Sequence, residues 1–336
     1  MNRNDMAAVQ SHGSEVKVRS DLDLTPLDLH GDPVLGFFGP ESVSWQVARE
    51  RFLYLAGIRT LLMQVAHPRI ARAGVEHSNF YIDPVGRFQR TFATVHAMVF
   101  GTQQQAIHAA DRLYAIHQQI KGPLAVSPQG QDEYVDIHAN ANTNPNSNSD
   151  NQGVSVANLP DTGLYDATDS HLLMWVYATL IDSAILISQQ VVPPDQWVDW
   201  DAYYQESKKF ALLCGVQPDI LPATRTDFHT WVQNMVESDE ITVTQEARHI
   251  NKVLLTASPM SRVLSPVMEA LTAGLLPPKL RAAYDYRWDA QVERSYDRYL
   301  WWTRVLLPYV PTPFRYVRAY HGANQRCQQY PLSGVQ

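Results

Sequence analysis

The sequence predicts an all-α fold, built as a single large helical domain. Apolar residues recur at three- and four-residue steps through most of the chain, while strand-like alternation is scarce. Apolar residues make up 45% of the 336 residues, which is enough to fill one sizeable core. No internal repeat and no sustained heptad pattern is present, so one packed domain is the architecture that the pattern favours.

The chain divides by composition into a central domain and weakly patterned ends. Residues 1–35 are polar and predict a mobile N-terminal tail, and residues 323–336 predict a C-terminal tail, which leaves the helical domain at 36–322. Within it, residues 126–160 are rich in Asn, Ser, Gln, Gly and Asp and lack the apolar surface that would offset chain entropy. They predict a disordered surface insertion, because the helices on both sides have apolar faces that need partners.

The first expected helix is long and begins after Ser42 or Ser44, either of which can cap it. Its stretch 48–66 is apolar on most sides and so belongs in the centre of the core, with Pro68 following its end. After a connector, a second helix opens at 87–91 and ends at Gly101. A third is expected at 103–121, stopped by Gly122 and Pro123. Further helices are expected at 170–190, 199–213, 226–236, 244–253, 261–273 and 279–307.

Charge interrupts the two most apolar runs. Arg59 lies inside the run 52–65, and Asp182 lies near the middle of the run 172–192. A charge at mid-bilayer costs roughly 3 kcal/mol, so both runs predict buried core helices rather than membrane spans. The N-terminus has no signal-peptide pattern, and two cysteines without a CxxC spacing predict neither a disulfide framework nor a zinc site. We therefore expect a soluble, cytoplasmic protein.

The net charge of −7 disfavours a protein built to bind nucleic acid. The charge is uneven, however. From Lys279 onward there are nine basic and four acidic residues, a balance of +5, so the rest of the chain carries −12. This C-terminal part, with its tryptophans, is either a solvated Arg-rich helix surface or a docking surface for anionic lipid or a partner protein.

Several common catalytic motifs do not occur. The sequence has no GxGxxG after a strand, no P-loop, no HExxH, no paired ExxH and no GxSxG. The usual nucleotide-binding, zinc-protease, di-iron and serine-hydrolase mechanisms therefore have no support from sequence.

A small group of polar residues on apolar helix faces could carry chemistry. His117 lies on the apolar stripe of the third helix, which directs its imidazole inward, although such a histidine is more often a hydrogen-bonded core residue. Arg87 and Thr91 are one turn apart on the second helix, with Arg90 beside them. These arginines indicate either surface ion pairs or a site for an anion. Thr179 is a polar residue in an apolar helix, where threonine usually bonds its own backbone.

Motifs in a fixed order give the sequence a resemblance to a known family. In chain order they are LLMQVAHP (61–68), HSNF (77–80), DPVGRFQRT (83–91), FG (100–101), IHQQIKG (116–122), WVYAT (175–179), LLPPKLR (275–281) and LPYVP (307–311). Together they resemble the rubber oxygenases (latex-clearing proteins) and the fungal MpaB-type oxygenases. The resemblance covers residues ~40–322.

The resemblance implies an all-helical protein that binds a b-type haem through one histidine, which it places at His117. It implies a distal or haem-edge role for Arg87, Arg90 and Thr91, with Thr179 nearby. An imidazole on one face of the iron leaves the other face open to dioxygen. The implied reaction is oxygenation of a hydrophobic small molecule or polymer, with cleavage of a carbon–carbon double bond.

Two residues depart from the family pattern. Tyr177 stands where many relatives have histidine, and Arg90 stands where latex-clearing proteins have lysine before the distal threonine. Glu76 is the nearest carboxylate in sequence, but no spacing assigns it a role. Two alternatives stay open at this point: a haem-binding sensor or carrier without turnover, and a peripheral membrane protein that uses the basic, aromatic C-terminal part.

Overall fold

The computed structural model describes residues 31–78, 83–124, 163–192, 198–256 and 259–329. The expected insertion at 126–160 lies outside the described residues, as does all but the end of the expected N-terminal tail.

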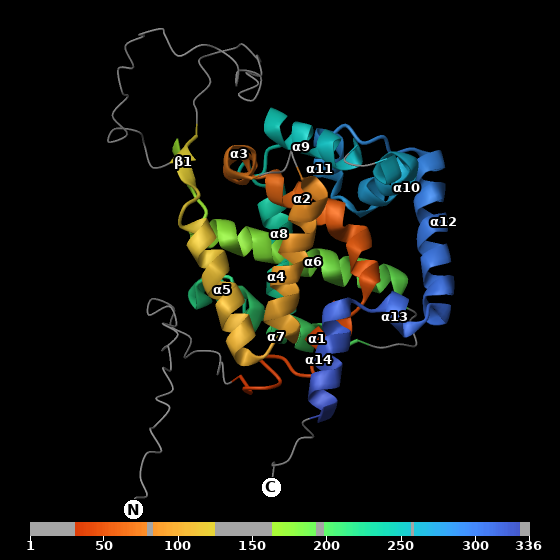
Figure 1. Cartoon of the computed structure of the whole chain (residues 1–336). Coiled ribbons are helices and arrows are strands. Elements are labelled where there is room, and N and C mark those ends of the chain that lie inside the picture. The colour runs from red at the N-terminus through yellow and green to blue at the C-terminus, as the bar shows by residue number, and fades with distance from the viewer. Residues whose placement is uncertain (1–30, 79–82, 125–162, 193–197, 257–258, 330–336) are drawn as a thin grey trace, which may run out of the picture.

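Helices dominate this part of the chain, and its only ladder is one short antiparallel pair, so the predicted all-α fold is confirmed (Figure 1). The first elements are α1 (Val43–Ala48), η2 (Arg51–Ala56), α2 (Gly57–Val65), α3 (Pro68–His77), α4 (Pro84–Phe100), α5 (Gln103–His117), β1 (Lys121–Pro123) and β2 (Leu164–Asp166). The later elements are α6 (Ser170–Val191), α7 (Trp200–Leu213), η5 (Pro218–Ile220), α8 (Arg225–Glu237), α9 (Gln245–Thr256), α10 (Pro259–Leu275), α11 (Pro278–Ala283), α12 (Ala290–Leu306), η6 (Leu307–Tyr309), α13 (Thr312–Arg315) and α14 (Arg318–Gln329).

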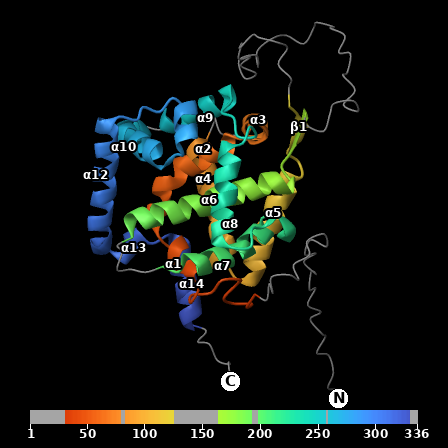
Figure 2. The same ribbon diagram turned by 180° about the vertical axis from the view of Figure 1, so that it is seen from behind.

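Helix α6 runs through the middle of the molecule, and the other helices surround it (Figures 1 and 2). Asp169 caps its first turn by accepting hydrogen bonds from the backbone N–H groups of His171 and Leu172. By length and composition α6 could cross a membrane, but 61% of its most apolar window is buried inside the protein. The helix is therefore a core helix, as its charged residue predicted.

Apolar side chains gather in one main core and two smaller clusters. The main core lies where α6 packs against α2, α7 and α8, and it includes Leu62, Trp175 and Phe228. A second cluster joins η2 to α10 and α12, and a third joins α1 and the end of α4 to α14. Every long helix thus buries one apolar face, which is where most helix stability in a folded protein originates.

Arg59 of α2 and Asp182 of α6, the charges that interrupt the two apolar runs, pair with each other. The Arg59 Nη2 and Asp182 Oδ2 atoms are 2.5 Å apart. Arg59 also donates through Nη1 to the Ser183 hydroxyl and through Nε to the Leu275 carbonyl oxygen, 2.8 Å away at the end of α10. The Arg59 side chain is 4% exposed. One buried guanidinium therefore joins three helices.

The predicted central helix at 48–66 is wrong in one respect: it is broken at Glu50. Glu50 has an extended backbone and pairs with Tyr316 in an isolated β-bridge. Its carboxylate accepts two hydrogen bonds from Arg315, at 2.7 and 2.8 Å. A contact with a segment more than 260 residues away therefore ends the helix locally, which periodicity within a short window does not show.

Three further boundaries differ from the expectation. The connector after Pro68 is the helix α3, because proline at the first helical position begins a helix as readily as it follows one. The expected helix at 279–307 is two helices, α11 and α12, separated by a turn in which Asp285 has a φ of 60°. The expected C-terminal tail from 323 is helical as far as Gln329, at the end of α14.

We predict that Arg59→Ala lowers the free energy of unfolding by about 3–5 kcal/mol, because it leaves the Asp182 carboxylate partly buried without its cation. Chemical denaturation monitored by circular dichroism would measure the change. Arg225→Ala is the matched control, since Arg225 pairs with Asp201 at the surface and such pairs contribute about 0–1 kcal/mol. Equal losses in the two variants would contradict the special role of Arg59.

Candidate functional site

Helices α4 and α5 form an antiparallel hairpin joined by Gly101 and Thr102 (Figure 1). Thr102 begins α5 with a capping box, in which its hydroxyl accepts from the Gln105 backbone N–H while the Gln105 side chain accepts from the Thr102 N–H. Because the helices run in opposite directions, the last turn of α5 lies level with the first turns of α4. The hairpin therefore brings His117 and Arg87 to the same end of the molecule.

His117 and Arg87 are both half-buried at this end. The Arg87 Nε donates a hydrogen bond of 2.6 Å to the hydroxyl of Ser78, the residue that follows α3. Burial lowers the pKa of the Arg87 guanidinium, and the neighbouring charge of Arg90 lowers it further. Arg87 is thus a desolvated cation beside the start of the hairpin.

The other expected site residues are either exposed on the same helix as Arg87 or buried in α6. Arg90 is 61% exposed and forms an ion pair of 3.0 Å with Asp83, the N-cap of α4. Thr91 is exposed, and its hydroxyl donates to the Arg87 carbonyl oxygen. Thr179 is fully buried in α6 and donates to the Val176 carbonyl oxygen at 2.8 Å, so its hydroxyl is used by its own helix.

A hydrogen-bonded cluster that the sequence did not predict lies next to Arg87. The buried hydroxyl of Tyr165, on β2, donates to the Glu76 carboxylate and lies 2.8 Å from the His77 Nε2 atom. Glu76 in turn pairs with Arg72, one turn earlier on α3, at 2.6 Å. Burial and the Glu76 charge raise the pKa of Tyr165, so the phenol keeps its proton.

Gly122 of β1 connects this cluster to the end of α5. Strand β1 pairs with β2 so that Gly122 lies opposite Tyr165. A Cβ atom on Gly122 would overlap the Tyr165 hydroxyl oxygen, so only glycine leaves room for it. The contact with Tyr165 therefore explains why the motif IHQQIKG ends in glycine. The sequence alone does not show this contact, because many residues separate Gly122 from Tyr165.

Two other buried histidines are neutral at pH 7. Burial lowers the pKa of His67 to about 4, and its Nδ1 atom accepts from the Arg69 backbone N–H at the start of α3. Burial likewise lowers the pKa of His96 to about 4, and its ring lies between Phe92 and Phe100. His67 caps α3 and His96 packs among aromatic rings, so a structural role explains the presence of each histidine.

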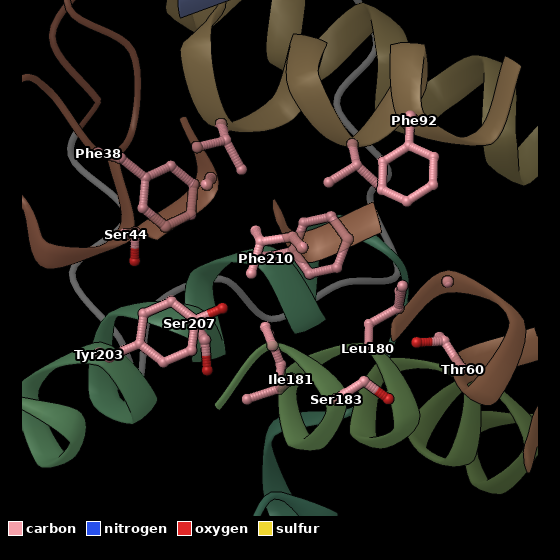
Figure 3. Close-up of a pocket in the computed structure, with 16 residues that line it drawn as sticks. Phe38, Ser44, Thr60, Phe92, Leu180, Ile181, Ser183, Tyr203, Ser207 and Phe210 are labelled. Atoms are coloured by element: carbon pink, nitrogen blue, oxygen red, sulfur yellow. The ribbon is translucent and has the colours of Figure 1, made fainter. Parts of the chain in front are cut away.

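An apolar pocket lies beside the inner face of α4 (Figure 3). It contains about 720 Å³ of space, part of it open to solvent. Its walls come from α1, η2, α2, α4, α6 and α7, and its larger lining residues include Phe38, Leu53, Phe92, Val95, Leu180 and Phe210. Phe92 lies little more than one helical turn after Arg87 on α4. The same helix therefore contributes residues both to the pocket and to the region of the polar cluster.

Comparison with known proteins gives one family and two distant relatives. Residues 45–305 match the family model described as "ER-bound oxygenase mpaB/B'/Rubber oxygenase, catalytic domain". The chain is 26% identical over 135 residues to an uncharacterized protein of Mycobacterium bovis, and to the same extent to one of Mycobacterium tuberculosis. These matches cover 40% of this chain and 53% of each relative, so the chain spans about half the length of the curated relatives it matches. No solved structure matches the chain.

We predict that Gly122→Ala lowers the free energy of unfolding by about 1–3 kcal/mol, because the new methyl group displaces the Tyr165 ring from Glu76 and His77. Gly322→Ala is the control, since no atom lies within 4 Å of a Cβ at that position. In a Tyr165→Ala background both the hydroxyl and the ring are gone, so most of the cost of Gly122→Ala should disappear in a double-mutant cycle. An unchanged cost in that background would refute the contact.

Proposed function

The chain belongs to the family of the mpaB-type and rubber oxygenases, and we propose that it uses haem b and dioxygen to oxygenate a hydrophobic substrate. The family match supports this proposal, together with three features of the fold: His117 ends α5, Arg87 is held by Ser78 beside the Tyr165–Glu76–His77 cluster, and an apolar pocket lies along α4.

The side chains at this end suit a haem. The iron needs one imidazole from the protein, for which His117 is the proposed ligand. The propionates need cations, and Arg87 is a guanidinium already held in a desolvated position. We assign Arg90 and Thr91 to the outer edge of the same site, because they lie on the exposed surface within a turn of Arg87. Thr179 receives no role, since its hydroxyl bonds its own helix.

When bound, the haem would supply an iron with one position open to dioxygen. The chain's own residues would then do three things. Arg87, fixed by Ser78, would orient an anionic group. The Glu76 carboxylate would accept the hydrogen bond of the protonated Tyr165 hydroxyl and so hold this phenol beside the His77 imidazole. The apolar pocket would exclude water from a hydrophobic substrate.

A haem-binding sensor or carrier would share His117 but would not consume its ligand. Oxygen uptake by the haem-loaded protein, measured with and without a hydrophobic alkene, separates the two functions. Steady consumption with the alkene indicates turnover. Reversible oxygen binding without consumption indicates a sensor or carrier.

We predict that the purified protein binds haem with a Soret band and that His117→Ala loses nearly all of it, because the axial ligand is gone. His108→Ala is the matched control, since His108 lies exposed on the same helix. Haem content per chain, from the pyridine haemochrome spectrum, is the measurement. Full haem content with an unchanged spectrum in His117→Ala would show that the ligand lies elsewhere, and His77 would be tested next.

A second role is supported by the surface of α12, η6 and α13. Large apolar side chains are exposed there in one stretch of the chain: Trp301, Trp302, Val305, Leu306, Tyr309 and Phe314. Tyr309 is 81% exposed and Phe314 is 70% exposed. Patches of this kind are rarely left open on a monomeric soluble protein. Exposed Arg294 and Arg298 lie on the same helix, within the part of the chain whose net charge is positive.

Tryptophan, tyrosine and arginine together are the composition of the membrane interface, where aromatic rings lie at the level of the headgroups and arginine attracts anionic lipid. We therefore propose that this α12–α13 surface docks on an anionic bilayer and leaves the opposite side of the molecule, with α5, free. Two copies of the chain paired on this surface would instead bring arginines of like charge together.

We predict that the protein sediments with phosphatidylcholine vesicles containing phosphatidylglycerol, and less with phosphatidylcholine alone. The double variant Trp301→Ser/Trp302→Ser should abolish binding, and Arg298→Glu should weaken it roughly fivefold or more, because each basic residue near the surface contributes about 1 kcal/mol. Arg112→Glu, an exposed arginine on α5, makes the same charge change elsewhere and should leave binding intact. Self-association without vesicle binding would identify the surface as a protein interface.

A further inference from the structure

Thr60 and Ser183 lie toward one end of the apolar pocket, and a second group of hydroxyl-bearing residues lies at the other end (Figure 3). Ser44 of α1 and Tyr203 and Ser207 of α7 make up this second group, while Phe92 and Leu180 lie toward the end with Thr60. The two elements are fastened together, because the Glu206 carboxylate of α7 accepts hydrogen bonds from the backbone N–H groups at the start of α1. The pocket is therefore lined mostly by apolar side chains, with hydroxyl groups at both ends.

Most hydroxyls around the pocket already have partners. Ser207 donates to the Tyr204 carbonyl oxygen at 2.7 Å and also contacts the Tyr177 hydroxyl at 2.8 Å. Thr60 donates to the Ala56 carbonyl oxygen, and Ser183 accepts from Arg59. These groups have their hydrogen bonds inside the protein and gain little from a ligand.

Ser44 and Tyr203 differ from the others. The Ser44 hydroxyl oxygen is buried and has no hydrogen-bond partner within the described residues, and the serine is 4% exposed. Tyr203 is 6% exposed and also lines the pocket, and its hydroxyl points toward the middle of the pocket in Figure 3. A buried hydroxyl left without a partner costs about 1–3 kcal/mol, so the Ser44 hydroxyl indicates a missing partner beside Tyr203.

The charge near this end limits what that partner can be. Burial raises the pKa of Tyr203 and the nearby Glu206 carboxylate raises it further, so the phenol stays protonated and can donate. The same carboxylate disfavours a second anion beside it. A neutral oxygen that accepts a hydrogen bond fits this end, and the rest of the pocket fits a carbon skeleton.

We propose that this pocket binds a small, uncharged, apolar molecule that carries a single oxygen group, such as a ketone, aldehyde or alcohol. The oxygen lies at Ser44 and Tyr203, and the hydrocarbon part lies along α4 and α6. A pure hydrocarbon polymer would leave the buried Ser44 hydroxyl without a partner. That this ligand is also the substrate oxidised by the enzyme rests on the proposed oxygenase function; the binding itself does not.

The test compares two probes that differ only in a hydroxyl group, 1-naphthol and naphthalene. Equilibrium dialysis against the full-length protein, with fluorescence detection, gives both dissociation constants. The wild-type protein should bind both, and Tyr203→Phe and Ser44→Ala should each weaken 1-naphthol binding about threefold to tenfold while leaving naphthalene unchanged. Tyr309→Phe removes an exposed phenol far from the pocket and should behave as the wild type.

Three outcomes would overturn the proposal. Failure of both probes to bind would show that the pocket is not a ligand site. Equal effects of Tyr203→Phe on the two probes would show a packing defect instead of a hydrogen bond. Unchanged 1-naphthol binding in both variants would indicate that water satisfies the two hydroxyls. Haem content, measured on the same samples, reports separately on the oxygenase proposal, so the two can fail independently.

Discussion

The buried ion pair between Arg59 and Asp182 is the constraint on which the arrangement of the core depends. An ion pair away from water is stabilising only when geometry and further hydrogen bonds compensate for lost hydration. Here the guanidinium also reaches Ser183 and the end of α10, so α2, α6 and α10 must keep one relative position. Because α2 and α6 both line the apolar pocket, the ion pair also fixes two walls of that pocket relative to each other.

Local pattern was sufficient to predict the helices that bury one face along their whole length. The expected helices at 170–190 and 199–213 match α6 and α7 closely, because their apolar periodicity and their capping aspartates agree. The breaks at Glu50 and Asp285 were missed. The first depends on a distant partner, Arg315, and the second on a backbone conformation that a non-glycine residue rarely adopts. Neither leaves a signal in a short window.

The candidate site was also predictable only in part. The family resemblance implied one site for His117 and Arg87, and the fold has them on two helices that run antiparallel because a two-residue connection joins them. Tyr165 could not be placed, since its partners Glu76 and Gly122 come from segments separated by long stretches of chain. The unpartnered hydroxyl of Ser44 was equally hidden. Ser44 lines an apolar pocket, and only the fold shows that its hydroxyl has no hydrogen-bond partner within the described residues.

The pairing of β1 with β2 has a consequence for how this protein can vary in length. The Leu124 backbone N–H donates to the Gly163 carbonyl oxygen at 2.6 Å, so the two points where the chain leaves and re-enters the described structure are neighbours. The pairing of the two strands itself holds Tyr165 opposite Gly122, so this register does not depend on how many residues connect the strands. The paired strands are therefore a position at which a segment can be inserted or deleted while Tyr165 stays beside Glu76. A reporter domain could be inserted at the same position.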